Sequence, residues 1–182
     1  ETHVLAANID QAILMITLFS PVTTTSFIDR FLVAANACDV DVALIFNKID
    51  LLNDKLKLEL ENLQQVYERI GYKCFSLSVF NDDLSIVKSL MNGKINMISS
   101  HSGVGKSTLI NKLQPNLNIN TKEVSDTHKQ GQHTTTFSEL YDLDFGASII
   151  DTPGIRGFGL VELETKEIAN YFPEFLALKS AC

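Results

Sequence analysis

Cysteine, basic residues and long apolar runs are all scarce in this sequence. The cysteines Cys38, Cys74 and Cys182 are odd in number and widely spaced, which argues against a disulfide framework and fits a reducing cytoplasm. We expect Cys38 and Cys74, which lie among apolar residues, to be buried thiols. The longest apolar run, 12–19, is far shorter than the roughly 20 residues that cross a bilayer. We therefore expect no membrane span and interpret this run as a buried strand.

The balance of charges limits the class of partner. Aspartate and glutamate number 22 against 15 lysines and arginines, which gives a net charge of −7. This argues against a domain that binds nucleic acid mainly through its own basic surface, so segments outside this chain would supply much of any attraction to RNA. The 182 residues are enough for one domain with a substantial core. Because the chain starts at Glu1 and carries no signal pattern, we expect a piece of a longer cytoplasmic protein.

Short apolar stretches alternate with stretches of helical periodicity. The predicted strands are 12–18, 42–46, 73–78, 96–99, 138–144 and 147–150, and the predicted helices are 27–37, 54–70, 84–91 and 106–113. Such alternation predicts an α/β fold, a mostly parallel sheet covered on both faces. Ligands of these sheets bind outside the carboxyl ends of the strands, so functional residues are expected in the loops that follow them.

A glycine-rich loop lies between the fourth predicted strand and the helix 106–113. It reads Ser100-His101-Ser102-Gly103-Val104-Gly105-Lys106-Ser107-Thr108, which matches the phosphate-loop pattern except that Ser100 replaces the first glycine. The glycines let backbone N–H groups converge on phosphate oxygens at a helix start. Lys106 would reach the β- and γ-phosphates, and Ser107 would ligate Mg²⁺. If position 100 needs a positive φ, Ser100 costs about 1 kcal/mol and weakens nucleotide binding. The loop predicts a three-layer P-loop NTPase fold.

The motif Asn47-Lys48-Ile49-Asp50 follows the strand 42–46 and predicts which base is bound. The Asp50 carboxylate can accept hydrogen bonds from N1 and the 2-amino group of guanine, a donor pair that adenine lacks. Lys48 would pack its stem along the base, and Asn47 would brace neighbouring loops. Ser78, at the end of the strand 73–78, would bring another short loop to the guanine.

Two further loops would sense the γ-phosphate and Mg²⁺. They are Asp151-Thr152-Pro153-Gly154, after the strand 147–150, and Gly131-Gln132-His133-Thr134-Thr135-Thr136, at the end of a long polar stretch. Asp151 suits water-mediated Mg²⁺ binding, and Gly154 would offer its N–H to the γ-phosphate. We expect the hydroxyl of Thr135, or else Thr134, to complete the metal shell, in a loop that γ-phosphate orders and hydrolysis releases.

The order of the motifs is a circular permutation. An ordinary small GTPase begins with the phosphate loop and has N-K-x-D late, whereas here N-K-I-D is at 47–50, the phosphate loop at 100–107 and D-T-P-G at 151–154. Permutation is tolerated because the termini of a domain often lie close together. It leaves D-T-P-G near the carboxyl end, where whatever follows can be coupled directly to the nucleotide state.

With these motifs in this order, the chain resembles the ribosome small-subunit-dependent GTPase A family, also called RsgA or YjeQ. The resemblance covers nearly the whole chain and is carried by A-A-N-I-D at 6–10, N-K-I-D at 47–50, H-S-G-V-G-K-S-T at 101–108, H-T-T-T at 133–136 and D-T-P-G-I-R at 151–156. It implies Mg²⁺-dependent hydrolysis of GTP to GDP and phosphate, stimulated by the small (30S) ribosomal subunit and coupled to its late maturation. The partners would be this subunit and its rRNA, and we expect a monomer. Ser100, Gln132 and Val79 depart from the family's usual glycine, arginine and alanine.

The resemblance also implies a domain arrangement. Residues 1–160 would be the circularly permuted GTPase domain and 161–182 a helical link toward a C-terminal zinc domain, with that domain and an N-terminal OB-fold outside this chain. Cys182 would be the first zinc ligand. Because a zinc site generally needs four ligands, no zinc is expected on this chain alone.

Catalysis would rest on charge stabilisation by Lys106, Mg²⁺ and the loop amides. Ras-like proteins place a glutamine after D-x-x-G to orient the attacking water, but Ile155 stands here, so slow intrinsic hydrolysis is expected. His133 is the first candidate to orient water and Gln132 the second. A bracing role fits His133 equally, while His101 is expected to pack within its loop. A permuted GTPase of large-subunit assembly and a nucleotide-dependent binding module with negligible catalysis remain as alternatives. An ATPase conflicts with Asp50.

Overall fold

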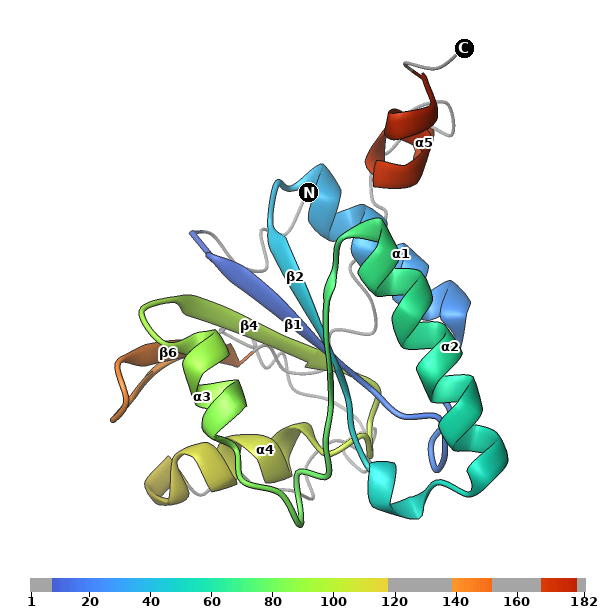
Figure 1. The fold of residues 1–182 in the computed structure, drawn as a ribbon. Helices are drawn as coiled ribbons and strands as arrows, with labels where there is room; N and C mark the ends of the chain where they lie inside the picture. The colour runs from blue at the N-terminus through green and yellow to red at the C-terminus, as the bar shows by residue number, and fades with distance from the viewer. Residues whose placement is uncertain (1–7, 118–138, 152–167, 180–182) are drawn as a thin grey trace, which may run out of the picture.

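Strands and helices alternate in the computed structural model, which describes residues 8–117, 139–151 and 168–179 (Figure 1). The strands are β1 (Gln11–Ile16), β2 (Asp41–Phe46), β3 (Lys73–Ser76), β4 (Ile95–Ser100), β5 (Glu139–Leu143) and β6 (Ala147–Asp151). The helices are α1 (Thr25–Ala37), α2 (Asp54–Ile70), α3 (Ser85–Met91), α4 (Lys106–Leu113) and α5 (Pro173–Lys179). Short 3-10 helices occur at η1 (Ile49–Leu51), η2 (Pro115–Leu117) and η3 (Ile168–Tyr171).

The strands form one six-stranded sheet in the order β3-β2-β1-β4-β6-β5. The pairs β1–β2, β1–β4, β2–β3 and β4–β6 are parallel, and only the terminal β5–β6 pair in this described sheet is antiparallel. Strand β1 lies at the centre, where Ile13 is opposite Ala43 of β2 and Ile98 of β4. The mostly parallel α/β sheet predicted from the sequence is therefore confirmed.

Helices cover both faces of this sheet, because alternate side chains of each strand point to opposite sides. Ile13 and Met15 of β1 belong to the apolar cluster beneath α3 and α4. Leu14 and Ile16, the residues between and after them, belong to the cluster beneath α1 and α2. All of β1 is buried, as expected for a central parallel strand that is covered twice. The result is three layers, with α1 and α2 on one side and α3 and α4 on the other (Figure 1).

Strand ends differ from the prediction where side chains compete for backbone groups. Strand β1 ends at Ile16 rather than at residue 18, because the Thr17 N–H donates to Thr23 Oγ1 at 3.2 Å and closes a loop. Strand β3 ends at Ser76 rather than at residue 78, because the Ser78 N–H donates to Asp82 Oδ2 at 2.7 Å. Strand β4 continues one residue beyond the prediction and ends at Ser100.

The prediction of two buried thiols is wrong for Cys38. This residue caps the carboxyl end of α1 and is exposed, because its apolar sequence neighbours lie on the inner face of the helix while Cys38 lies at the tip. Cys74 is only half-buried, since β3 is an edge strand. In the part of the chain that the structure describes, no helix is both long enough and apolar enough to pass through a bilayer.

Candidate functional site

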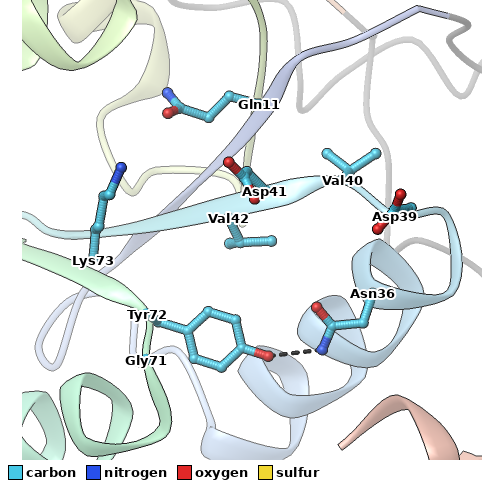
Figure 2. A pocket seen from close by; sticks show the side chains of 9 residues that line it. All are labelled: Gln11, Asn36, Asp39, Val40, Asp41, Val42, Gly71, Tyr72 and Lys73. Carbon is cyan, nitrogen blue, oxygen red and sulfur yellow. Dashed lines mark hydrogen bonds between the residues drawn. The ribbon is translucent and has the colours of Figure 1, made fainter. Parts of the chain in front are cut away.

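A cavity lies at the amino edge of the sheet, away from the motifs. It has a volume of about 220 Å³ and is lined by residues at the starts of β1, β2 and β3, among them Gln11, Asp41 and Lys73 (Figure 2). Asn36 borders it and donates from Nδ2 to Tyr72 Oη at 2.8 Å. None of the predicted site residues lines this cavity, so the candidate site must be sought at the opposite edge of the sheet.

At the carboxyl edge, Asn47 joins three loops. Its side chain is buried, and Nδ2 donates to the Val104 carbonyl of the phosphate loop at 2.8 Å. Its Oδ1 accepts from the Val79 N–H, in the loop after β3, at 2.9 Å. A carboxamide carries both a donor and an acceptor, so asparagine can satisfy both neighbours at once. The loops that follow β2, β3 and β4 are thereby held in one arrangement.

Lys48 makes a second connection to the phosphate loop. Its backbone is left-handed, with φ of 63°. The ammonium Nζ donates to the Ser20 carbonyl at 2.6 Å and to the Gly103 carbonyl at 2.7 Å. Ser20 belongs to the loop between β1 and α1, a neighbour that no motif spacing indicated. Lys48 thus ties this loop to the backbone of the phosphate loop.

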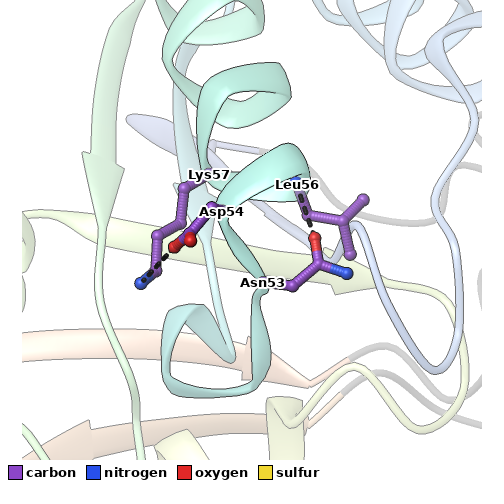
Figure 3. A network of polar contacts seen from close by, with 4 residues as sticks. All are labelled: Asn53, Asp54, Leu56 and Lys57. Carbon is purple, nitrogen blue, oxygen red and sulfur yellow. Dashed lines mark hydrogen bonds and ion pairs between the residues drawn. The ribbon is translucent and has the colours of Figure 1, made fainter.

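Asp50 lies on a short, well-supported segment that leads into α2. It is exposed within η1. Helix α2 begins directly afterwards, where Asn53 Oδ1 accepts from the Leu56 N–H at 3.0 Å (Figure 3). This cap replaces a missing backbone partner and fixes the point at which the helix starts. The carboxylate of Asp50 is therefore presented to solvent from a segment whose two ends are held.

Ser78 stabilises the turn that follows β3 through hydrogen bonds within that turn. Ser78 is buried, and its Oγ accepts from the Asn81 N–H at 3.3 Å. Its carbonyl accepts from the Asp82 N–H at 2.8 Å. Further along, Lys112 of α4 donates from Nζ to the Phe80 carbonyl at 2.7 Å, a contact that the sequence reasoning missed. The Ser78 side chain therefore stabilises this turn.

The phosphate loop has the conformation that its glycines permit. Gly103 has φ of +80° and Gly105, which caps the start of α4, has φ of +112°. Among described residues other than glycine, positive φ occurs at Asn8, Ser20, Asp39 and Lys48. Ser100 is not one of these, so the strain considered for a serine at this position does not arise. The rest of the loop, from His101 to Thr108, follows β4 directly and enters α4 at Lys106.

Two of the predicted Mg²⁺ ligands belong to elements that the structure describes. Ser107 lies at the start of α4, and Asp151 is the last residue of β6, the strand that pairs with β4. A serine hydroxyl and a carboxylate are oxygen ligands of the kind that Mg²⁺ prefers. No group of three or more His, Cys, Asp or Glu side chains gathers within the described ranges. His133, Thr135, Gly154 and Cys182 lie outside those ranges.

Comparison with known proteins identifies relatives of this chain. The family model described as RsgA GTPase matches residues 1–161. The small ribosomal subunit biogenesis GTPase RsgA of Flavobacterium johnsoniae is 54% identical over 183 residues, covering 100% of this chain and 56% of the relative. The protein of the same name from Porphyromonas gingivalis is 47% identical over 186 residues, covering 100% of this chain and 59% of the relative. The chain thus spans little more than half the length of these curated relatives.

Two solved structures have the same fold. The crystal structure of YjeQ from Thermotoga maritima aligns with a TM-score of 0.79 and 32% identity, covering 92% of this chain and 56% of that one. The structure of YloQ, described as a circularly permuted GTPase, aligns with a TM-score of 0.76 and 28% identity, covering 96% and 55%. The permuted order of motifs along this chain therefore has structural counterparts.

Proposed function

Because this chain belongs to the RsgA GTPase family, we propose that it binds GTP with Mg²⁺ and hydrolyses it to GDP and phosphate. The observation that carries the proposal is the pair of hydrogen bonds of Asn47. They connect the base-reading segment that contains Asp50 to the phosphate loop through Val104. A nucleotide needs both ends of its site at a fixed separation, and this buried side chain supplies the connection.

In this proposal the base is recognised by Asp50 and the phosphates by the loop 100–108. The Asp50 carboxylate accepts from N1 and the 2-amino group of guanine, and a site that leaves this carboxylate unpaired rejects adenine. The amides around Gly103 and Gly105, at the start of α4, bind the phosphate oxygens. Ser78 supports the loop whose backbone meets the guanine.

For hydrolysis, Lys106 places its ammonium on the β- and γ-phosphates and stabilises the charge that develops there. Ser107, Thr135 and Asp151, the last through water, would hold Mg²⁺, which would supply further neutralisation of phosphate charge. His133 is proposed to orient the attacking water and Gly154 to donate its N–H to the γ-phosphate. Since Ile155 can neither donate nor accept a hydrogen bond from its side chain, intrinsic hydrolysis is expected to be slow.

The proposed partner is the small (30S) ribosomal subunit with its rRNA, after the printed names of the curated relatives. Because the net charge is −7, we propose that segments outside this chain would supply much of any attraction to RNA. We propose residues 1–160 as the GTPase domain of a cytoplasmic monomer and 161–182 as a link to a C-terminal zinc domain, where Cys182 would be a ligand.

A competition experiment tests the nucleotide site first. A fluorescent GDP analogue is titrated with the protein in Mg²⁺, and GDP, GTP and ATP are added as competitors. Competition by GDP and GTP but not by ATP is the expected result. Equal competition by ATP would reject the role of Asp50.

Phosphate release then tests catalysis and the partner together. The rate is measured for the protein alone, with isolated 30S subunits and with 50S subunits. Stimulation by 30S subunits is expected. Stimulation only by 50S subunits would instead indicate a GTPase of large-subunit assembly. Binding without stimulated release would indicate a nucleotide-dependent binding module, the alternative that Ile155 favours.

A further inference from the structure

An aromatic contact links the phosphate loop to the first turn of α1. The rings of Phe27 and His101 lie with centroids 3.8 Å apart and planes inclined at 34°. Phe27 is partly buried and packs against the apolar cluster beneath α1 and α2. The side chain of His101 leaves the loop just after β4. One residue of the phosphate loop is therefore stacked on a side chain that is anchored in the core.

The loop between β1 and α1 meets the phosphate loop close to this contact. A Cβ at Gly103 would lie 3.6 Å from Pro21 Cδ, which is ordinary van der Waals contact. Lys48 Nζ joins the Ser20 and Gly103 carbonyls on the same side. At the start of α1, Thr24 Oγ1 accepts from the Phe27 N–H at 3.3 Å and fixes the turn from which the ring projects. The position of the Phe27 ring is thus fixed by its own helix and by the core.

A phosphate loop without its ligand has a physical reason to lose this shape. Its N–H dipoles converge on one point, and they repel one another until an anion arrives. If the loop relaxes, the free-energy cost of ordering it again makes nucleotide binding weaker. Asn47 fixes the buried side of the loop at Val104, and Lys48 holds the Gly103 carbonyl. The start of the loop, at His101, needs a support of its own.

We propose that Phe27 is a positioning residue for nucleotide binding, which acts by stacking on His101 and so holds the phosphate loop ready for the phosphates. This rests on the function proposed above and adds a residue that lies outside the GTPase motifs. Phe27 touches no part of the nucleotide in this proposal. Its effect is on the fraction of molecules whose loop is already ordered, so it should change affinity and leave the chemical step alone.

The variant that tests this is Phe27→Leu, which keeps an apolar side chain against the core but removes the ring. We expect GDP to bind roughly three- to tenfold more weakly, the size of effect typical of an aromatic pair. KM for GTP should rise by the same factor while kcat stays unchanged. Phe27→Tyr keeps the ring and should restore normal affinity. His101→Ala should weaken binding by a similar factor, and the double variant should be no weaker than either single one.

Leu63→Ala is the matched control, because Leu63 of α2 packs against the same apolar cluster. It should lower the melting temperature at least as much as Phe27→Leu and leave GDP affinity unchanged. Equal affinity of Phe27→Leu and the unmodified protein, or strictly additive effects of Phe27→Leu and His101→Ala, would overturn the positioning role while the GTPase proposal stands. Failure of the unmodified protein to bind guanine nucleotides would overturn both.

Discussion

Gly105 lies so close to Asn47 that a Cβ at position 105 would come within 2.5 Å of Asn47 Nδ2. Asn47 cannot give way without cost, because it is buried and holds both Val104 and Val79 by hydrogen bonds. The glycine before the P-loop lysine is therefore needed twice, once for its φ of +112° and once for the space beside it.

Gly105→Ala should therefore abolish most nucleotide binding. The added methyl displaces the Asn47 carboxamide, and we expect affinity for GDP to fall about 10- to 100-fold, since hydrogen bonds worth about 1–3 kcal/mol are broken. Gly71→Ala is the matched control: Gly71 has φ of +113° but nothing within 4 Å of its added Cβ. It should lower stability by about 1 kcal/mol and leave GDP affinity unchanged. Isothermal titration and thermal unfolding of both variants measure these effects.

Asn47→Asp separates the two hydrogen bonds of this side chain. Aspartate can still accept from the Val79 N–H but cannot donate to the Val104 carbonyl, and the new charge faces that carbonyl oxygen. We expect a loss of unfolding free energy of about 2–4 kcal/mol, because the buried carboxylate has no counter-ion and faces a carbonyl oxygen. GDP binding should fall with it, as measured by urea denaturation and by titration. A variant as stable as the unmodified protein would contradict the bracing role.

Asp50→Asn should change the preferred base. An amide presents a donor where the carboxylate presented only acceptors, so it matches the 2-oxo group of xanthine rather than the 2-amino group of guanine. Competition by XDP against GDP should improve by about 100-fold or more relative to the unmodified protein. Because Asp50 is exposed, the melting temperature should barely change. Unchanged preference for guanine would remove Asp50 from the base site.

Asn36→Ala should loosen the contact between α1 and the segment 168–179. Asn36 Nδ2 donates to Tyr72 Oη and to the Tyr171 carbonyl, each at 2.8 Å. Loss of both bonds should lower stability by about 1–3 kcal/mol. Tyr72→Phe removes only the first bond and serves as the control. Limited proteolysis should cleave near Tyr171 faster in Asn36→Ala than in Tyr72→Phe, and equal cleavage would show that the Tyr171 contact does not hold the segment.

Cys38 should react with thiol reagents well before Cys74. Cys38 is exposed. Burial, helped by the negative charge of Glu68, raises the pKa of the Cys74 thiol to about 12. Because the thiolate is the nucleophile, this raised pKa leaves very little of Cys74 in the reactive form at pH 8. Alkylation with iodoacetamide in a Cys182→Ser background, followed by peptide mapping, compares the two rates. Equal labelling of both cysteines in the native protein would contradict the difference in burial.

Several features of this protein follow from its sequence alone. The alternation of apolar strands with helical periodicity determined the α/β class, because the spacing of apolar residues within a short segment is enough to indicate a strand or a helix. The spacing of Gly103, Gly105 and Lys106 predicts where the phosphate loop lies, and Asn47 with Asp50 predicts the base. The order of these motifs determined the permutation, which is a property of the chain and not of its packing.

Only the tertiary structure decided what these residues touch. Asn47 and Val104 are 57 positions apart, and Lys48 and Ser20 are 28 apart, so both contacts depend on the order of strands in the sheet. The same order brings Phe27 onto His101 from a helix that carries no motif. Cys38 was misjudged because its sequence neighbours are apolar while its place at the end of α1 is exposed. Ser100 proved unstrained because it ends a strand. Backbone conformation, exposure and contact partners are set by the packing of whole elements, which no local pattern contains.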